Sequence, residues 1–334
     1  MTKRIPADTT WKLLTLMANG KFHSGEILAR QLGISRASVF NLLSKVAGIG
    51  VDLHRVRGRG YRLGRPWEKL DAGEISSRLG DYAGRFDIEI FEQARSSNAL
   101  LMQRCRAAGV NDRLQTGNVL AVELQTDGRG RLGRTWHSGL GNSLTFSVLW
   151  KFGCGLNSLS GLSLAVGVSQ VRALKRLGAR DVYLKWPNDI LTGRGKLGGV
   201  LVEAQGDVLG PSTVVIGVGI NCSVPAYLHA RIDQPACGLD EVCLDLPCRN
   251  QLMAALLSDL ADAMRDFERG GLALLRAEWE RYHLHQNCQV DLNLPDGEIA
   301  SGTARGINDM GELCLENRRG IRYFNSGEIG IQPI

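Results

Sequence analysis

The central part of the chain contains, at positions 125–136, the stretch QTDGRGRLGRTW, which directly follows a predicted strand at 119–124. Three glycines within six residues cost backbone entropy, and they let backbone NH groups approach an anion closely. The interleaved Arg129, Arg131 and Arg134 supply multidentate donors for carboxylate or phosphate. The stretch predicts an anion-binding loop, although a flexible basic surface loop or a nucleic-acid patch would have the same composition.

Alternating apolar patterns on both sides of this loop predict strands interspersed with helices. We expect strands at 86–91, 119–124, 143–151, 182–185, 196–204 and 213–219, and helices at 70–79, 96–107, 158–177 and 251–269. The predicted class is α+β, with a mixed central sheet and helices against one face.

Two later segments also carry residues suited to anions. The first contains KWPND at 185–189 and KLGGVLVE at 196–203, and the second is GVGIN at 217–221. Lys196 begins an otherwise apolar strand, where a snorkelling surface lysine is the simpler explanation. A Gly-x-Gly at a strand end allows close approach to a base or ribose, but a turn would explain it equally well.

The N-terminal residues concentrate the positive charge. Residues 1–66 hold 12 Lys and Arg against 3 Asp and Glu, whereas the rest of the chain holds 28 against 31. Helical patterns at 9–18, 25–32 and 36–46, with Ser24 and Ser35 as N-caps and Gly33 as the turn, predict a helix-turn-helix. The Gly- and Arg-rich hairpin at 51–63 resembles a wing that neutralises phosphates. A three-helix module for protein interaction is the alternative. The candidate DNA contacts are Arg36, Ser38, Asn41, Lys45, Arg55, Arg57 and Arg59.

Composition excludes several classes of protein. The chain has 334 residues with 44% hydrophobic and 22% charged residues, contains no apolar run of about 18 residues, and begins without an apolar signal segment. We therefore expect a cytoplasmic protein that does not enter a membrane. Its eight cysteines form no C-x-x-C pair and lie at no zinc-like spacing from histidines, so we expect free thiols and no tightly bound metal.

The three central segments, in this order, resemble the motifs of the biotin–protein ligases, and the N-terminal helix-turn-helix makes the resemblance specific to their bifunctional ligase/biotin-operon-repressor type. The resemblance covers essentially the whole chain. It implies a winged helix-turn-helix domain at 1–65, a linker at 66–82, a catalytic domain at 83–284 with the biotin/lipoate ligase-like mixed sheet, and an SH3-like β-barrel at 285–334. Short predicted strands at 289–292, 302–307, 313–315 and 321–323, separated by turns, agree with a small C-terminal barrel.

The resemblance also implies a two-step reaction. Biotin and ATP form biotinyl-5'-AMP with release of pyrophosphate, and the biotin then passes to a lysine of a biotin carboxyl carrier protein, a subunit of acetyl-CoA carboxylase. Lys196, Arg131 and Arg134 are the implied catalytic residues. The residues implied to bind biotin are Ser96, Ser97, Asn98, Gln125, Gly128, Arg129, Arg131, Lys196 and Gly199. Those implied to bind the adenylate are Arg131, Arg134, Trp136, Lys185, Asn188, Asp189 and Asn221. Mg²⁺ is expected only with ATP, near Asp189.

The adenylate is further implied to act as a corepressor that favours a homodimer on operator DNA of the biotin synthesis genes. Alternatives are a ligase whose winged helix has lost operator binding, a non-catalytic biotin-sensing repressor, and a lipoate or octanoate ligase. Asp127 stands where many relatives have a small neutral residue, and it could pair with Arg129 or Arg131. Leu132 replaces a residue that is often basic, and residues 222–241 lack an obvious aromatic cap for adenine.

Overall fold

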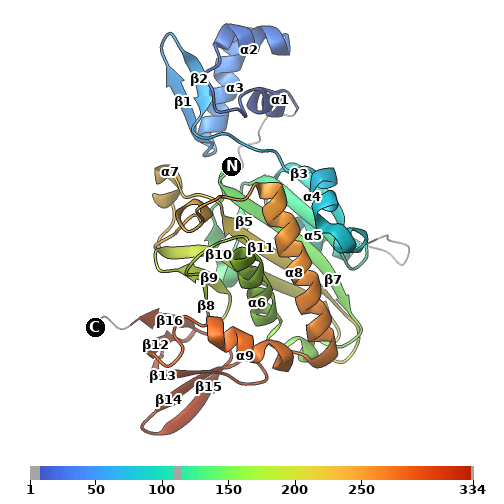
Figure 1. The fold of residues 1–334 in the computed structure, drawn as a ribbon, viewed down its shortest axis with the longest axis vertical. Helices are drawn as coiled ribbons and strands as arrows, with labels where there is room; N and C mark the ends of the chain where they lie inside the picture. The colour runs from blue at the N-terminus through green and yellow to red at the C-terminus, as the bar shows by residue number, and fades with distance from the viewer. Residues whose placement is uncertain (1–7, 108–113, 332–334) are drawn as a thin grey trace.

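The computed structural model describes residues 8–107 and 114–331. A helical unit with a hairpin occupies one end of the molecule, a large sheet with its helices forms the body, and a smaller sheet forms the other end (Figure 1). The expectation that the chain has no secretory signal concerns the first seven residues, which lie outside the described residues. Within the described ranges, no helix has the length and apolar character that a membrane span requires.

The N-terminal unit has the predicted helix order. It contains α1 (Thr9–Leu16), α2 (Gly25–Leu32) and α3 (Arg36–Gly48), followed by the antiparallel hairpin of β1 (Leu53–Val56) and β2 (Gly60–Leu63). Ser24 Oγ accepts a hydrogen bond from the backbone NH of Ile27 at 3.1 Å, and Ser35 Oγ accepts one from Ser38 at 3.0 Å. Both serines therefore act as the expected N-caps. Gly33 ends α2 with a φ of +65°.

A buried carboxylate joins this unit to the body. Glu123, whose side chain is fully buried, accepts hydrogen bonds from Trp67 Nε1 at 3.2 Å, from the Leu70 backbone NH at 2.6 Å and from Arg249 Nη1 at 2.6 Å. A buried charge is tolerated when it is paired and hydrogen-bonded. The segment between the hairpin and α4 (Ala72–Leu79) is thus held against the sheet rather than free.

Seven strands form the central sheet, in the order β3-β4-β7-β11-β10-β9-β8. The sheet is mixed, as predicted, because β3 and β4 run parallel and the other neighbours run antiparallel. The strands are β3 (Asp87–Ala94), β4 (Asn118–Gln125), β7 (Ser143–Phe152), β8 (Tyr183–Lys185), β9 (Asp189–Thr192), β10 (Gly195–Gly206) and β11 (Ser212–Asn221); β9 was not expected. Two further short strands, β5 (Gly128–Arg129) and β6 (Thr135–Trp136), form a hairpin within the glycine-rich stretch.

The longer helices cover one face of this sheet, as expected. They are α6 (Leu162–Arg176) and α8 (Arg249–Gly270), and α4 and α9 (Ala273–Tyr282) pack in the same core. Helix α5 (Ser97–Ala107) packs on the opposite face, where Leu101 and Met102 meet Leu149 and Val215. Helix α6 begins four residues later than predicted, because residues 156–159 form a separate 3₁₀ turn and Gly161 adopts a φ of +78° before the helix.

The two faces of the sheet differ in side-chain size. In β7, Leu144, Phe146 and Val148 face the core with α6 and α8, and in β11 Ile216, Val218 and Ile220 do the same. The alternate positions hold small or polar residues, because successive side chains of a strand point to opposite faces. Those residues are Ser143, Thr145, Ser147, Gly217, Gly219 and Asn221, and they leave a shallow surface beside α5.

The C-terminal part is a five-stranded antiparallel sheet in the order β15-β14-β13-β12-β16. Four strands were expected: β12 (Gln289–Asn293), β13 (Ile299–Ile307), β14 (Leu313–Asn317) and β15 (Gly320–Phe324). The fifth, β16 (Glu328–Ile331), pairs with β12. A backbone hydrogen bond from Leu284 NH to the Leu184 carbonyl at 2.9 Å connects this part to β8, the edge strand of the central sheet.

Candidate active site

A cavity of about 640 Å³ lies over the small-residue surface of β7, β10 and β11. Its size is that of a pocket for a small ligand. Fourteen of the fifteen residues expected at the chemical site line it, although they come from four separate stretches of the chain. They are Ser96, Ser97, Asn98, Gln125, Arg129, Arg131, Arg134, Trp136, Lys185, Asn188, Asp189, Lys196, Gly199 and Asn221. Gly128 lines a smaller cavity on the other side of the glycine-rich loop.

Two glycines of β11 give the cavity its floor. A Cβ atom on Gly217 would lie 2.1 Å from Asn98 Oδ1, and one on Gly219 would lie 2.7 Å from Trp136 Cε2. Side chains at these positions would displace the residues that form the walls. The Gly-x-Gly of the GVGIN segment is therefore a requirement for close approach and not a turn, since both glycines lie inside a continuous strand.

The α5 end of the cavity is a buried polar corner. Ser147 Oγ lies 2.7 Å from Ser97 Oγ and 2.5 Å from Asn98 Oδ1. Gln125 Oε1 accepts a hydrogen bond from the Ser97 backbone NH at 2.7 Å, and Asn98 Nδ2 donates to Glu203 Oε2 at 3.0 Å. These bonds fix the side chains, so that the polar corner is already formed without a ligand.

Lys196 and Asp189 form an ion pair near the middle of the cavity. Their Nζ and Oδ1 atoms are 2.6 Å apart, and both side chains are mostly buried. Asn221 Nδ2 donates to the Lys196 carbonyl at 3.1 Å, and the Lys196 backbone NH donates to the Pro235 carbonyl at 2.9 Å. Hydrogen bonds to its carbonyl and from its NH therefore fix the Lys196 backbone, and the ion pair with Asp189 fixes its ammonium group.

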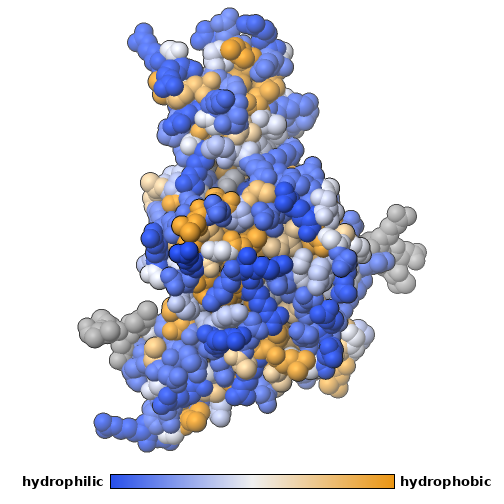
Figure 2. Space-filling view, viewed as in Figure 1, coloured by the Kyte–Doolittle hydropathy of each residue, from blue (hydrophilic) through white to orange (hydrophobic). Residues whose placement is uncertain are grey.

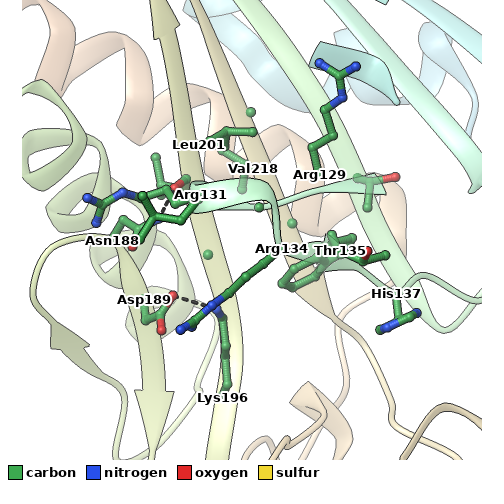
Figure 3. Close-up of a pocket in the computed structure, with 18 of the residues that line it drawn as sticks. Arg129, Arg131, Arg134, Thr135, His137, Asn188, Asp189, Lys196, Leu201 and Val218 are labelled. Carbon is green, nitrogen blue, oxygen red and sulfur yellow. Dashed lines mark hydrogen bonds and ion pairs between the residues drawn. The ribbon is translucent and has the colours of Figure 1, made fainter. Parts of the chain in front are cut away.

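The arginines of the glycine-rich loop also line the cavity, and they point in different directions (Figure 3). Arg131 is partly buried, and this burial lowers its pKa, against the opposing effect of Asp189. Arg134 makes two hydrogen bonds to the carboxylate of Glu328, one of them 2.7 Å long, and this contact lowers the pKa of Glu328. Arg129 is exposed and points away from the Asp189–Lys196 pair in Figure 3.

The cavity has an excess of cations. Among the described residues that line it, six are basic and three are acidic. Burial lowers the pKa of Lys185, while Asp189 and Glu328 act in the opposite direction. A water-poor site with clustered cations binds anions such as carboxylate and phosphate. The basic residues are Arg129, Arg131, Arg134, Lys185, Lys196 and Arg231, and the acidic ones are Asp189, Asp233 and Glu328.

Several lining residues were not identified from the sequence. Thr145 could have been found, because it interrupts an apolar strand, and the same signal marks Ser147, which lies behind the lining and contacts Ser97 and Asn98. Glu328 carried no such signal, since it reaches the cavity from β16, 194 residues beyond Arg134. His137, whose pKa is lowered by burial, and Arg231 and Asp233 complete the wall beside Trp136.

The expectation for Asp127 was wrong. Its Oδ2 atom accepts a hydrogen bond from Arg95 Nη2 at 2.6 Å, and among the described residues it forms no ion pair with Arg129 or Arg131. The backbone explains this choice, because the Asp127 NH donates to the Arg95 carbonyl at 2.9 Å and holds the two residues side by side. Leu132 is 74% exposed at the tip of the loop, with a φ of +54° that is unusual for a side chain other than glycine.

The candidate DNA contacts lie apart from this cavity, on the N-terminal unit. Arg36, Asn41 and Lys45 are exposed on α3, whereas Ser38 is half-buried, and its hydroxyl lies 2.9 Å from that of Ser35. The three arginines expected in the wing are exposed on β1 and at the hairpin tip: Arg55, Arg57 and Arg59.

Comparison with known proteins identifies the family to which this chain belongs. Residues 102–221 match the biotin/lipoate A/B protein ligase family, and residues 284–330 match the biotin protein ligase C-terminal domain. The chain is 36% identical to the bifunctional ligase/repressor BirA of Escherichia coli over 96% of both chains, and 29% identical to that of Bacillus subtilis over 93% of this chain and 94% of the relative. The biotin protein ligase of Aquifex aeolicus, solved with biotin and ATP, has a TM-score of 0.60 at 25% identity and covers 73% of this chain and 97% of its own. The chain therefore belongs to the biotin protein ligase family, and it aligns over 93–96% of its length with these two relatives described as bifunctional ligase/repressors.

Proposed function

We propose that this protein joins biotin to ATP, forming biotinyl-5'-AMP and pyrophosphate, and then transfers the biotin to a lysine of a biotin carboxyl carrier protein. The observation that carries the proposal is that Lys196, paired with Asp189 at 2.6 Å, lines one cavity together with Arg131 and Arg134. Two anions must meet in the first step, and fixed cations in a partly dehydrated site lower the cost of that encounter.

In the first step a biotin carboxylate oxygen attacks the α-phosphorus of ATP. A new oxygen–phosphorus bond forms, the bond to the bridging oxygen of the β-phosphate breaks, and pyrophosphate leaves with both electrons of that bond. Lys196 stabilises the charge on the carboxylate and α-phosphate, while Arg131 and Arg134 neutralise the phosphates. In the second step the amine of the acceptor lysine attacks the acyl carbon of the mixed anhydride, AMP leaves, and the amine loses a proton.

We assign the ends of the cavity to the two halves of the adenylate. The polar corner of Ser96, Ser97, Asn98 and Gln125 suits the ureido ring of biotin, with Gly199 allowing close approach and Arg129 closing over it. Gly128 would act behind the lining, where a Cβ would lie 3.2 Å from Gln125 Nε2. Trp136, Lys185, Asn188 and Asn221 then belong to the nucleotide side. The carboxylate of Asp189 has one oxygen paired with Lys196, so its second oxygen suits a Mg²⁺ ion that enters with ATP and neutralises the leaving pyrophosphate.

Pyrophosphate release tests the ligase proposal. The full-length protein should release pyrophosphate only when biotin and ATP are both present, and lipoate or octanoate should not replace biotin. Release that is equally fast with lipoate would contradict the assignment of biotin as substrate. Adenylate formation with no transfer to any carrier domain would support the biotin-sensing alternative.

We also propose that biotinyl-5'-AMP acts as a corepressor, so that the adenylate-bound protein forms a homodimer on operator DNA of the biotin synthesis genes. Residues 222–241 support such coupling, because this segment contacts both parts of the molecule. Arg231 lines the cavity, and its Nη1 atom would lie 2.8 Å from a Cβ on Gly50, beyond the end of α3. Arg65 pairs with Asp240 at 2.6 Å. A change in this segment on nucleotide binding would therefore reach the winged helix.

A gel-shift experiment with and without biotin and ATP tests the repressor role. Binding to an operator should strengthen with the adenylate and weaken steeply with salt. Identical binding in both states would instead favour a ligase whose winged helix has lost its regulatory role. Deleting residues 1–65, the unit that we propose as the DNA-binding domain ahead of the linker at 66–82, separates the two activities. The proposed catalytic domain at 83–284 and C-terminal domain at 285–334 remain in that variant.

A further inference from the structure

One large apolar side chain stands on the exposed face of α3. Val39, Leu43 and Val46 of this helix are buried in the N-terminal core, whereas Phe40 is 41% exposed. The other exposed residues along this face are polar, basic or small: Arg36, Ala37, Asn41, Ser44 and Lys45. Single exposed apolar residues are common on protein surfaces, so what Phe40 can bind depends on its place in the helix and on its neighbours.

A wing arginine lies against this ring. Arg55 Cζ is 4.9 Å from the centroid of Phe40 and 6.0 Å from that of Tyr61. The guanidinium is therefore oriented by two aromatic rings, one from α3 and one from β2, through cation–π attraction. In the part of the chain that the structure describes, Arg55 forms no ion pair with a carboxylate, and neither do Arg36 and Lys45. Their charges are available to an external anion.

We propose that Phe40 is a base-reading residue of α3, and that its exposed ring packs against the 5-methyl group of a thymine in the major groove while Arg55 contacts a neighbouring phosphate. This inference rests on the proposed operator binding and adds a specificity determinant to it. The thymine methyl is the one apolar group on the major-groove edge of a base pair. A recognition helix places its N-terminal part against base edges, and Phe40 is the fifth residue of α3.

The surroundings of Phe40 favour double-stranded DNA over other partners. Arg36 and Lys45 on α3 and Arg55 on the wing form no ion pair among the described residues, and Figure 2 shows mostly hydrophilic residues, with some hydrophobic ones between them, at this end of the molecule. A hydrophobic protein partner would be met by a larger continuous apolar patch. An RNA duplex offers a deep, narrow major groove that side chains do not read, and its uracil has no methyl group. One isolated ring among cations fits a methyl group beside phosphates.

The test begins with selection of binding sequences from a random duplex DNA library by the full-length protein with biotin and ATP. Each thymine of the enriched sequence is then replaced in turn by deoxyuridine, which removes only the methyl group, and the Kd is measured for the wild type and for Phe40→Ala. We expect one thymine in each half-site whose replacement weakens wild-type binding about three- to fivefold, the effect of burying one methyl group. Phe40→Ala should bind the unmodified duplex more weakly and lose this methyl dependence, while Phe40→Leu retains part of it.

The controls separate this role from a structural one. Ser44→Ala, one turn further along the same face, should keep the methyl dependence of the wild type. Unchanged pyrophosphate release by Phe40→Ala verifies that the variant is folded. Equal losses for wild type and Phe40→Ala at every deoxyuridine position would overturn the inference while leaving operator binding intact. A library from which the wild type enriches no sequence would overturn both operator recognition and the role of Phe40.

Discussion

Arg134 of the glycine-rich loop and Glu328 of β16 are joined by two hydrogen bonds, although they lie in different parts of the fold and stand 194 residues apart. The pair makes the C-terminal sheet part of the cavity wall, because Glu328 and Gly327 both line the cavity. An arginine on a loop with three glycines has many accessible positions, and a bidentate contact with a carboxylate removes most of them. The C-terminal part therefore contributes to the position of Arg134, the side chain that we propose to bind phosphate.

Substitution Glu328→Gln should raise the KM for ATP about two- to fivefold, with a smaller effect on the KM for biotin. The magnitude corresponds to the loss of a partly exposed ion pair, worth at most about 1 kcal/mol. Steady-state pyrophosphate release at varied ATP provides the measurement. Glu298→Gln is the matched control, since Glu298 directly precedes β13 of the C-terminal sheet and lies outside the cavity lining, 3.9 Å from Arg322. An unchanged KM for ATP in Glu328→Gln would show that Arg134 needs no such support.

Lys196→Ala should reduce biotin-dependent pyrophosphate release about 10²- to 10³-fold, which is the usual cost of removing one donor that stabilises charge in the transition state. Asp189 would lose its partner in this variant, so thermal melting must show that the protein remains folded. Lys69→Ala, an exposed lysine that pairs with Glu92 at 3.6 Å, serves as the control and should have wild-type activity. Release within about twofold of the wild type by Lys196→Ala would remove this residue from the mechanism.

Gly217→Ala should weaken biotin binding more than tenfold. The added Cβ would lie 2.1 Å from Asn98 Oδ1 and push that side chain out of the polar corner, and overpacking of this kind also costs about 1–3 kcal/mol of stability. Calorimetric titration with biotin measures the loss. At Gly153 a Cβ would have no atom within 4 Å, so Gly153→Ala tests whether any glycine substitution has the same effect. Wild-type affinity in Gly217→Ala would mean that biotin does not use this corner.

Acid should destabilise the connection between the central and C-terminal sheets. Burial lowers the pKa values of His283 and His285 to about 4, and three of their four ring nitrogens have no hydrogen-bond partner. The unfolded chain binds protons near its ordinary pKa of 6.5, so the neutral histidines contribute stability above this pH that is lost as the pH falls toward 4. His283 alone would account for about 3 kcal/mol.

Urea unfolding between pH 7 and pH 4 measures this dependence. His283→Phe keeps a ring stacked on Trp279, whose centroid lies 4.5 Å from that of His283, and it should flatten the curve. His229→Gln, at an exposed position of α7 (Ala226–His229), should follow the wild type. A His283→Phe variant with the full pH dependence of the wild type would place the sensitivity elsewhere.

Features that neighbouring residues decide could be predicted from the sequence, whereas contacts between distant segments could not. Local patterns were sufficient for the Ser24 and Ser35 caps, the strand β7 and the small residues of β11, because neighbouring residues decide those features. The prediction that Asp127 pairs with Arg129 or Arg131 was wrong, because a backbone hydrogen bond holds Asp127 beside Arg95, the residue directly after β3. Glu328 could not be predicted, since only the fold of the C-terminal sheet places it beside Arg134.

Mass spectrometry of a biotin carboxyl carrier domain, after incubation with this protein, biotin and Mg·ATP, tests the central claim most directly. The account predicts that the carrier gains the mass of one biotinyl group on one lysine, that omission of ATP prevents the gain, and that Lys196→Ala forms the product only at a small fraction of the wild-type rate. A carrier domain that stays unmodified with active wild-type protein, biotin and ATP, while a control ligase modifies it, would contradict the account.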